Sequence, residues 1–585
     1  MKPITVLSIY TAHNATCAFL KDGKLVSAVS EERFNRKKNW IGFPIQSIEW
    51  TLKNYNLRPE DIDAVAVCGK IVTAGIASEA LERKTPLLSK IYGNVEYRSG
   101  PFYGPIFGAK DLLIDKPHNF GQKGRLIKLI CDHVGVPKNK IIFVDHHTCH
   151  AYSAYFGQTN EREKALVLTL DGEGDNSCAT VNKAWGYNVK RTSSTWRHYS
   201  IGYIYSLTTK FMGMTPLEHE YKVMGLAPYA STKEKKYFMK TYDKAFKGVI
   251  DLDKENPLNF RSRFPTNRFE LYLRQKAVGE RFDNLAGALQ YMTEDVVSRW
   301  VKKVVQKTKN PNLYCGGGVF MNVKMNMLIA ELPEVKKLNI LPSCGDESNP
   351  IGAAYYTYIQ LCRERGIRPK TERITDLYLG PDYDDEVEDY IRKRRLERKY
   401  RVRKADAKTI AQMIAKGEIV ARSVGRMEWG ARSLGNRCIM ANPSDLRYVW
   451  QINEQIKMRD FWMPFAPTIL KERERDYIKN PKKIEAPYMI MAFRSTDLAK
   501  KELRAAMHQA DFTLRPQMLE RSWNPKYYDI IKEFENITGI GGILNTSFNL
   551  HGKPIVASPK DAVEETFEQS GLNHLLLGDY LISKK

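Results

Sequence analysis

VLSIYTAHNATCAFLKDGKLVSAV, residues 6–29, alternates apolar and small polar residues and is interrupted at Lys-Asp-Gly. That pattern predicts three antiparallel strands joined by tight turns. ALVLTLDGEGDNSCATVNKAWGYNVK, residues 165–190, repeats the plan with an Asp-Gly break. Two such meanders, each opening a lobe, predict a duplicated actin-like α/β core in which the first turn of each lobe faces a phosphate-bearing ligand.

A glycine-rich element follows both meanders. LYCGGGVFMNVKMN, residues 313–326, predicts a strand, a glycine turn and a helix. Alone, such a turn is often only a tight turn, but in this order it indicates backbone that approaches a nucleotide or phosphate. The candidate contacts are Gly316, Gly317, Gly318 and Asn322.

The chain has 585 residues, which is too long for one hydrophobic core. A polar stretch near residue 370 predicts two domains, 1–372 and 373–585, the second of mixed α/β pattern. Neither a signal peptide nor an apolar run of membrane-spanning length is seen, and the nine cysteines form no CxxC pair. We therefore expect a cytoplasmic protein with no membrane partner. The oligomeric state stays open, a homodimer being one option.

The net charge is strongly positive: 91 Lys and Arg against 67 Asp and Glu leave +24. One interpretation is a lysine-rich proteome; the other is a polyanionic partner. Residues 391–404 hold a basic run, and residues 94–105 and 188–205 interleave basic and aromatic side chains. That interleaving suits nucleic-acid binding, or else the aromatic side chains pack inward.

Two histidines suggest a metal site. In VDHHTCHAYSAYF, residues 144–156, His146 and His150 lie four apart and would share one helical face. Such a pair alone is more often a surface or core feature, but Asp171 follows a buried strand and Asp346 lies in a loop before a helix. This donor set suits iron, manganese or zinc.

The second domain carries a set of basic and polar residues that suits phosphate oxygens. Lys457 and Arg459 are two apart, which predicts one side of a strand, and Ser547 and Asn549 follow a strand at the same spacing. Each arginine alone would be a solvated charge; together they predict an anion pocket. Its arginines are Arg426, Arg432, Arg437, Arg459 and Arg515.

The motifs HHTCH, LDGEGD, EYKVMGLAPY, CGGGVFMN and PSCGDESNPIGAAY, in this order, resemble the NodU/CmcH carbamoyltransferases, including tobramycin-carbamoyltransferase-like enzymes. The resemblance covers nearly the whole chain. It implies a first domain similar to the threonylcarbamoyl transferases of tRNA, with an actin-like fold and a bound metal. It also implies a YrdC-like α/β second domain, to which the K-x-R and S-x-N pairs are similar.

The resemblance implies a role for each motif residue. The metal ligands would be His146, His150, Asp171 and Asp346, with Fe²⁺ foremost and Mn²⁺ or Zn²⁺ as alternatives. The transfer pocket would hold His13, Asn14, Glu32 of the EERF segment (31–34), and Lys222. Many relatives have Asp where this chain has Asn14, which leaves an acid/base role for that position in doubt.

The implied activity is ATP-dependent O-carbamoyl transfer. The second domain would form carbamoyl adenylate from carbamoyl phosphate and ATP with Mg²⁺, and the first would deliver the carbamoyl group to a hydroxyl. Because a carbamoyl adenylate hydrolyses in water, we expect an internal route between the sites.

The acceptor is the open part of this hypothesis. The charge favours 5-hydroxymethylcytosine in DNA, as in phage DNA hypermodification, and the alternative is a small-molecule or sugar hydroxyl. A tRNA threonylcarbamoyl enzyme is disfavoured by the domain order, and a non-catalytic nucleic-acid-binding protein by the retained site residues.

Overall fold

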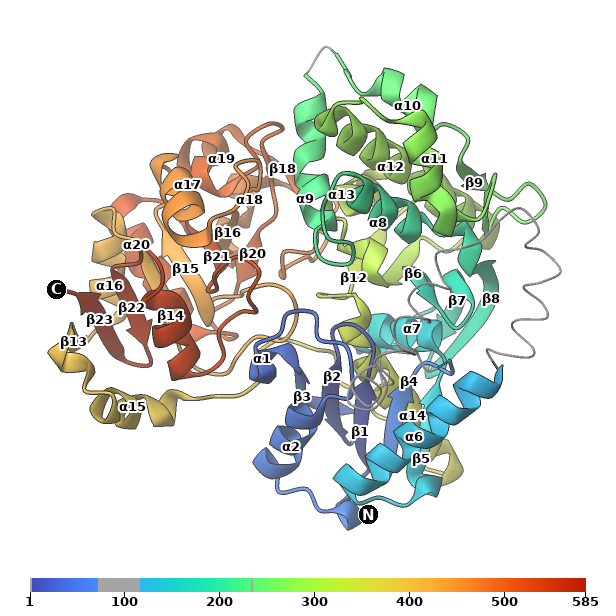
Figure 1. Ribbon diagram of the computed structural model, residues 1–585, viewed down its shortest axis with the longest axis horizontal. Coiled ribbons are helices and arrows are strands. Elements are labelled where there is room, and N and C mark those ends of the chain that lie inside the picture. Colours follow the sequence, from blue (N-terminus) through green and yellow to red (C-terminus); the bar gives the residue numbers. More distant parts are fainter. Residues whose placement is uncertain (1–2, 72–115, 233–234) are drawn as a thin grey trace, which may run out of the picture.

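The computed structural model describes residues 3–71, 116–232 and 235–585 (Figure 1). Its first five-stranded sheet has the order β3-β2-β1-β4-β5. Strands β1, β2 and β3 form an antiparallel meander, whereas β4 and β5 run parallel to β1. The elements are β1 (Thr5–Tyr10), β2 (Thr16–Lys21), β3 (Lys24–Ser30), α1 (Glu32–Asn35), α2 (Ile45–Asn54), β4 (Ala64–Cys68), α6 (Lys116–Val134), β5 (Ile141–Val144) and α7 (His146–Phe156).

The second sheet repeats the first. Its order is β12-β11-β6-β7-β8, again an antiparallel meander beside two parallel strands. This confirms the predicted duplication. The elements are β6 (Ala165–Gly174), β7 (Ser177–Trp185), β8 (Asn188–Trp196), α8 (Ile201–Phe211), α9 (Glu220–Leu226), α10 (Met239–Ala245), β9 (Ile250–Leu252), β10 (Phe260–Ser262), α11 (Phe269–Lys276), α12 (Phe282–Thr308), β11 (Asn312–Gly316), α13 (Val323–Glu331), β12 (Lys337–Ile340) and α14 (Asn349–Glu364).

The hairpin turns differ in one respect from the expectation. Asp22 and Gly23 form the β2–β3 turn with φ of 48° and 77°, as the Lys-Asp-Gly signal predicts. In the second meander, however, Asp171 and Gly172 remain inside β6. The turn lies instead at Asp175–Asn176, where φ is 48° and 67°. The buried strand thus carries the Asp171 carboxylate inward rather than around a turn.

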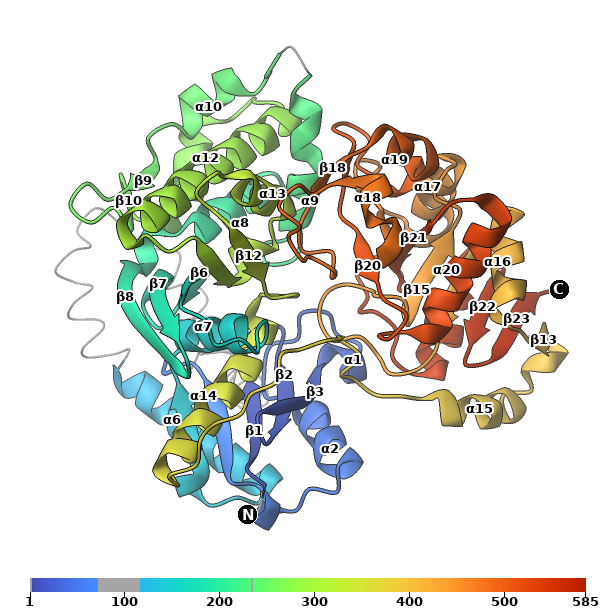
Figure 2. The ribbon, with the colours of Figure 1, turned by 180° about the vertical axis from the view of Figure 1, so that it is seen from behind.

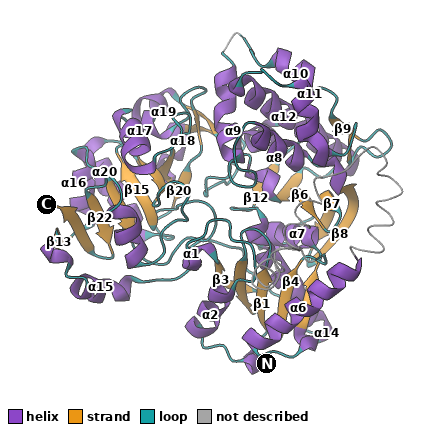
Figure 3. Cartoon of the chain, in the orientation of Figure 1, coloured by secondary structure: helices purple, strands orange, loops and turns teal. Residues whose placement is uncertain are grey.

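Helices α7 and α14 pack between the two sheets (Figure 3). Helix α14 contacts β1, β2 and β4, while α7 contacts β6 and β11, and the two helices contact each other. They approach closely because Gly352 has no side chain: a Cβ there would overlap the carbonyl of Cys149. This layer fixes α7, which carries both predicted histidine ligands.

The remaining sheet has eight strands in the order β13-β23-β22-β14-β15-β21-β16-β20, and three short strands, β17-β18-β19, lie beside it. Figure 2 shows this sheet separate from the first two. The elements are α15 (Val387–Lys393), β13 (Tyr400–Lys404), α16 (Ala407–Ala415), β14 (Val420–Ser423), β15 (Arg437–Ala441), α17 (Arg447–Gln451), β16 (Ala466–Leu470), α18 (Glu474–Tyr477), β17 (Ile478–Lys479), β18 (Phe493–Ser495), α19 (Asp497–Glu502), β19 (Thr513–Leu514), β20 (Gln517–Leu519), α20 (Pro525–Thr538), β21 (Gly542–Ser547), β22 (His574–Leu577) and β23 (Tyr580–Lys584).

Two arginines of helix α1 and its C-terminal cap bind the second half of the chain. Arg36 donates to the carbonyls of Ile555 and Pro554 at 2.8 and 3.0 Å, and its Nη2 lies 2.7 Å from Glu565. Arg33 donates to the carbonyl of Gly430 at 2.7 Å. The largest cluster of buried apolar side chains contains residues of both halves. The boundary at 372/373 therefore stays a prediction. Within the described ranges, no helix is long and apolar enough to cross a bilayer.

Candidate active site

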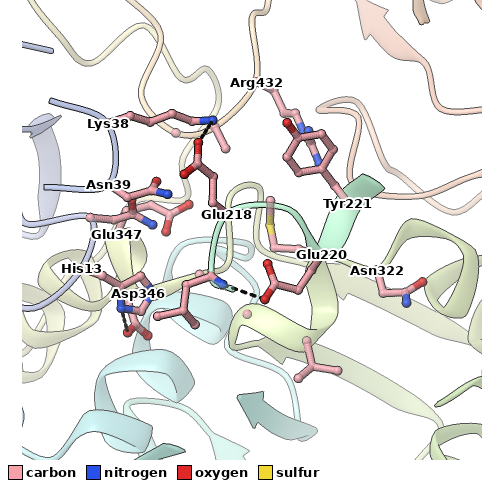
Figure 4. A pocket seen from close by; sticks show the side chains of 18 of the residues that line it. His13, Lys38, Asn39, Glu218, Glu220, Tyr221, Asn322, Asp346, Glu347 and Arg432 are labelled. Carbon is pink, nitrogen blue, oxygen red and sulfur yellow. Dashed lines mark hydrogen bonds and ion pairs between the residues drawn. The ribbon is translucent and has the colours of Figure 1, made fainter. Parts of the chain in front are cut away.

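One cavity of about 730 Å³ is lined by residues of all three large sheets and their loops. Figure 4 shows His13 and Asp346 at one side of it and Arg432 at another. Three of the predicted metal ligands and several of the predicted anion-binding residues thus border the same space: His146, Asp171 and Asp346, and Arg432, Lys457, Arg459, Arg515, Ser547 and Asn549. The two chemistries expected from the sequence share a cavity rather than occupying separate ones.

The four predicted metal ligands lie together. One donor atom from each of His146, His150, Asp171 and Asp346 falls within 4.8 Å of the others, and all four residues are buried. The two Nε2 atoms are 3.2 Å apart. Asp171 Oδ2 lies 3.1 Å from His146 Nε2, and Asp346 Oδ1 lies 3.3 Å from His150 Nε2. Two imidazoles and two carboxylates form a donor set that fits a divalent iron, manganese or zinc ion.

Local sequence explains this convergence. Asp145 caps α7 by accepting from the Thr148 amide at 2.8 Å, which places His146 in the first turn and His150 one turn later. The buried end of β6 presents Asp171, whose Oδ1 accepts from the Gly318 amide at 2.8 Å. Asp346 follows the loop after β12.

The charges in the cluster are strongly coupled. Burial would lower the pKa of His146, but the Asp346 and Asp171 carboxylates outweigh it and raise the pKa to about 10. Burial would raise the pKa of Asp171, but its hydrogen bonds to the two histidines hold the pKa well below the usual range. A cation bound here would take the place of these protons.

The glycine turn at residues 316–318 packs against the candidate metal cluster and the backbone beside it. Only Gly318 and Asn322 of that set line the cavity, while Gly316 and Gly317 pack against the carbonyls of His150 and Leu170. This corrects the predicted phosphate cradle. The Gly318 amide is already bonded to Asp171, and Asn322 caps α13 by accepting from the Met325 amide.

His13 and Tyr10 both contact Asp346. Its Oδ2 accepts from the Tyr10 hydroxyl at 2.5 Å and lies 3.4 Å from His13 Nδ1. Since Oδ1 of the same carboxylate faces His146 and His150, Asp346 links the candidate metal cluster to His13. His13 is 26% exposed and lines the cavity.

The other predicted transfer residues differ in position. Asn14 and Glu32 line the cavity, and Asn14 has a φ of 60°, which Asn tolerates better than most residues. Glu31, the neighbour of Glu32, instead accepts from the Ser47 amide and so supports α2. The Lys222 ammonium lies 3.1 Å from Asp460 Oδ2, so it pairs with the second half of the chain.

Five cationic side chains of the second half line the cavity, namely Arg432, Lys457, Arg459, Arg515 and Lys553. Burial, followed by the charges of Arg432 and Arg459, lowers the pKa of Arg515 well below its usual value. Burial and the Arg459 charge do the same to the pKa of Lys457. Like charges that depress each other's pKa favour binding of an anion, which relieves the repulsion.

Contrary to the prediction, Lys457 and Arg459 do not lie on a strand but at and after the end of a helix. Lys457 ends a short π-helix (Ile452–Lys457), and Met458 then adopts a left-handed φ of 47°. Ser547 is the last residue of β21, and Asn549 follows the strand, so the S-x-N pair lies at the strand's end rather than wholly after it. Lys457 Nζ donates to Ser547 Oγ at 3.2 Å and to Asn549 Oδ1 at 2.7 Å. The K-x-R and S-x-N pairs thus meet at this lysine.

Two predicted anion ligands lie elsewhere. Arg437 is buried and donates to the carbonyls of Gly425 and Ala557. Arg426 donates to the carbonyls of Gly380 and Val26. Both guanidiniums are used on backbone carbonyls and are not part of the cavity lining, which corrects their assignment.

The sequence reasoning missed several cavity residues, among them Lys38, Glu218, Glu220, Glu347 and His551. Lys38 and Glu218 form an ion pair of 2.8 Å (Figure 4). Three of these residues had a signal in the sequence: Glu220 opens the EYKVMGLAPY motif, Glu347 follows Asp346 within PSCGDESNPIGAAY, and His551 follows the S-x-N pair by two residues.

The features that suggested nucleic acid are dispersed. Residues 94–105 lie outside the described residues. The basic run of 391–404 spans α15 and β13, the edge strand of the eight-stranded sheet, on the side away from the other sheets (Figures 1 and 2). Arg392 and Lys393 pair with Asp389. Nearer the cavity, Arg197 and Tyr203 line it.

Two family models match this chain. The model described as "Carbamoyltransferase N-terminus" matches residues 4–355, and "Carbamoyltransferase C-terminus" matches residues 411–584. Similar curated proteins include an uncharacterized protein of Methanocaldococcus jannaschii, 33% identical over 82% of this chain and 80% of that protein. Nodulation protein NolNO of Sinorhizobium fredii is 29% identical over 98% of this chain and 79% of its own length.

A solved structure of full-length HypF in a phosphate- and nucleotide-bound form is 13% identical, covering 60% of this chain and 55% of that one, with a TM-score of 0.31. At that score the likeness carries no argument.

Proposed function

Since this chain belongs to the carbamoyltransferase family, we propose that it is an ATP-dependent O-carbamoyltransferase whose activation and transfer steps share one cavity. The chain is an enzyme of that family; the ATP dependence and the route are the proposal. The observation that carries it is the single cavity lined both by Lys457, Arg459 and Arg515 and by His13 and Asp346.

In the activation step, carbamoyl phosphate and water would give carbamate and phosphate. Carbamate oxygen then attacks the α-phosphorus of ATP, and pyrophosphate leaves. The cationic residues Lys457, Arg432, Arg459 and Arg515 would neutralise the phosphates, with Ser547 and Asn549 orienting Lys457. We propose that this half is the YrdC-like unit implied by the sequence.

In the transfer step, an acceptor hydroxyl attacks the carbamoyl carbon and the bond to the AMP phosphate breaks. His13, oriented through Nδ1 by Asp346, would take the hydroxyl proton. Tyr10 holds the same Asp346 oxygen and so limits its rotation. A divalent metal held by His146, His150, Asp171 and Asp346 would polarise the reacting carbonyl or phosphate oxygen.

Two acceptors follow from the sequence, and a specific observation bears on each. Arg197 and Tyr203 at the cavity support a nucleobase such as 5-hydroxymethylcytosine in DNA. The remoteness and internal pairing of the basic run support the alternative, a free sugar or other small hydroxyl compound.

The acceptor test incubates the enzyme with ATP, carbamoyl phosphate and either hydroxymethylated DNA or free sugars and aminoglycosides. Carbamoylated base recovered after nuclease digestion would identify DNA, because salt-sensitive binding alone is expected of any chain of charge +24. Product on a free sugar, with none on DNA, would identify a small-molecule enzyme.

A further inference from the structure

Lys38 is a cation of the first half that reaches the shared cavity. It lies between α1 and α2, lines the cavity, and places Nζ 2.8 Å from Glu218 Oε1. The two side chains are 26% and 21% exposed, and both line the cavity. Figure 4 shows the Lys38 ammonium directed at the Glu218 carboxylate.

The positive charge of Lys38 acts on ionisable side chains of the second half that line the cavity. Its charge contributes, after burial and Arg459, to the lowered pKa of Lys457. It also contributes to the lowered pKa of His551, after burial and Lys222. Next along the chain, Asn39 lines the same cavity. Lys38 therefore lies within electrostatic reach of the phosphate-binding cations although it belongs to the half that carries His13.

The chemistry of transfer calls for a cation in such a position. The phosphate of a carbamoyl adenylate carries one negative charge. When the carbamoyl carbon–oxygen bond breaks, the bonding electron pair stays on that oxygen, and AMP leaves with a second negative charge. An ammonium beside the phosphate stabilises this developing charge.

We propose that Lys38 binds the phosphate of the activated donor during transfer, and that Glu218 holds Lys38 until this phosphate arrives. The inference rests on the proposed function. It assigns a donor-binding residue to the first half of the chain. In this scheme, phosphate and Glu218 compete for one ammonium.

If phosphate and Glu218 compete for Lys38, substitutions at the two residues should change phosphate affinity in opposite directions. AMP, a product of the transfer step, serves as the probe. Lys38→Ala should weaken AMP binding about tenfold or more, as expected for loss of one charge-assisted contact. Glu218→Gln should tighten AMP binding about two- to fivefold, because the ion pair no longer has to be broken. In the Lys38→Ala background, Glu218→Gln should have no effect.

The matched control is Lys37→Ala. Lys37 is the exposed neighbour, whose ammonium lies 4.8 Å from the Trp40 ring centre and does not line the cavity. Calorimetry of AMP with the full-length wild type and the four variants, alongside their melting temperatures, gives the result. If the ion pair were only structural, Lys38→Ala and Glu218→Gln would change AMP affinity in the same direction or leave it unchanged. Either result would overturn the inference.

The outcomes separate this inference from the proposed function. Wild-type chain that fails to bind AMP would overturn both. AMP binding that is equal in Lys38→Ala and Lys37→Ala would overturn the role of Lys38 alone.

Discussion

At the residue scale, Asp346 connects two parts of the site. Oδ1 lies 3.4 Å from His146 and 3.3 Å from His150, whereas Oδ2 contacts Tyr10 and His13. One carboxylate therefore orients the proposed base and completes the donor set for a cation. A change at this residue should disturb both.

The first prediction concerns metal content. His146→Ala or Asp346→Ala should lose bound metal and carbamoyl transfer, because each removes one of four buried donors. Carbamate-dependent exchange of pyrophosphate into ATP should persist, since the cationic residues are unchanged. Elemental analysis of purified protein measures the metal. His147→Gln is the control: His147 bonds Thr169 and Ser177 and is not in the cluster. Wild-type metal content in Asp346→Ala would refute the ligand assignment.

The second prediction concerns the cationic residues. Arg515→Ala should weaken carbamoyl phosphate and ATP use by about 1.5–3 kcal/mol, the usual worth of a hydrogen bond to a charged group. The expected readout is a higher KM in pyrophosphate exchange. Arg521→Ala, six residues on at an exposed ion pair with Asp529, should leave KM unchanged. Equal kinetics of the two variants would exclude Arg515 from donor binding.

At the element scale, the end of strand β6 controls the candidate metal cluster. A Cβ at Gly174 would overlap the His146 ring, whereas a Cβ at Gly172, two residues earlier in the same strand, meets no atom within 4 Å. Gly174→Ala should therefore displace His146 and lower metal affinity about ten- to a hundredfold. Gly172→Ala should retain it. Metal titration of both variants is the measurement, and equal affinities would contradict the geometry.

Elements were the most predictable level of this structure. The first meander and the α7 histidine pair follow from period-two and period-four patterns that operate over a few residues. The Asp171–Gly172 turn was misplaced because Asp-Gly has the same local signal whether a strand ends there or continues. Arg426 and Arg437 were misassigned because a sequence does not reveal whether a guanidinium meets carbonyls or an anion.

Residues paired across long separations were the least predictable. Lys38 meets Glu218 across 180 positions, and no local pattern marks either residue. Tyr10 meets Asp346 across 336 positions. Such contacts depend on how the halves pack, which local propensity does not determine.

At the scale of the whole molecule, the cavity exists because the two halves stay together. Arg36 contributes to this by binding two backbone carbonyls and Glu565 of the other half. Arg36→Ala should cost on the order of 2 kcal/mol and lower the melting temperature, since a partly buried charged donor loses several partners. It should also increase futile AMP release, because the intermediate is less well enclosed.

Arg58→Ala provides the comparison for Arg36. Arg58 is 69% exposed and pairs with Glu60 and Asp61, which are close to it in the sequence. Arg58→Ala should therefore leave the melting temperature and AMP release nearly unchanged. If Arg36→Ala matched Arg58→Ala in melting temperature and AMP release, the halves would not depend on this contact.

The most direct test of the account follows one labelled carbamoyl group. The enzyme is supplied with carbamoyl phosphate labelled at carbon, with and without ATP, together with the hydroxyl panel of DNA, sugars and aminoglycosides. The account predicts labelled carbamoyl ester on a hydroxyl, formed only with ATP and in step with AMP and pyrophosphate. Labelled product formed equally well without ATP would contradict it, because the carbamoyl group would then pass directly from carbamoyl phosphate.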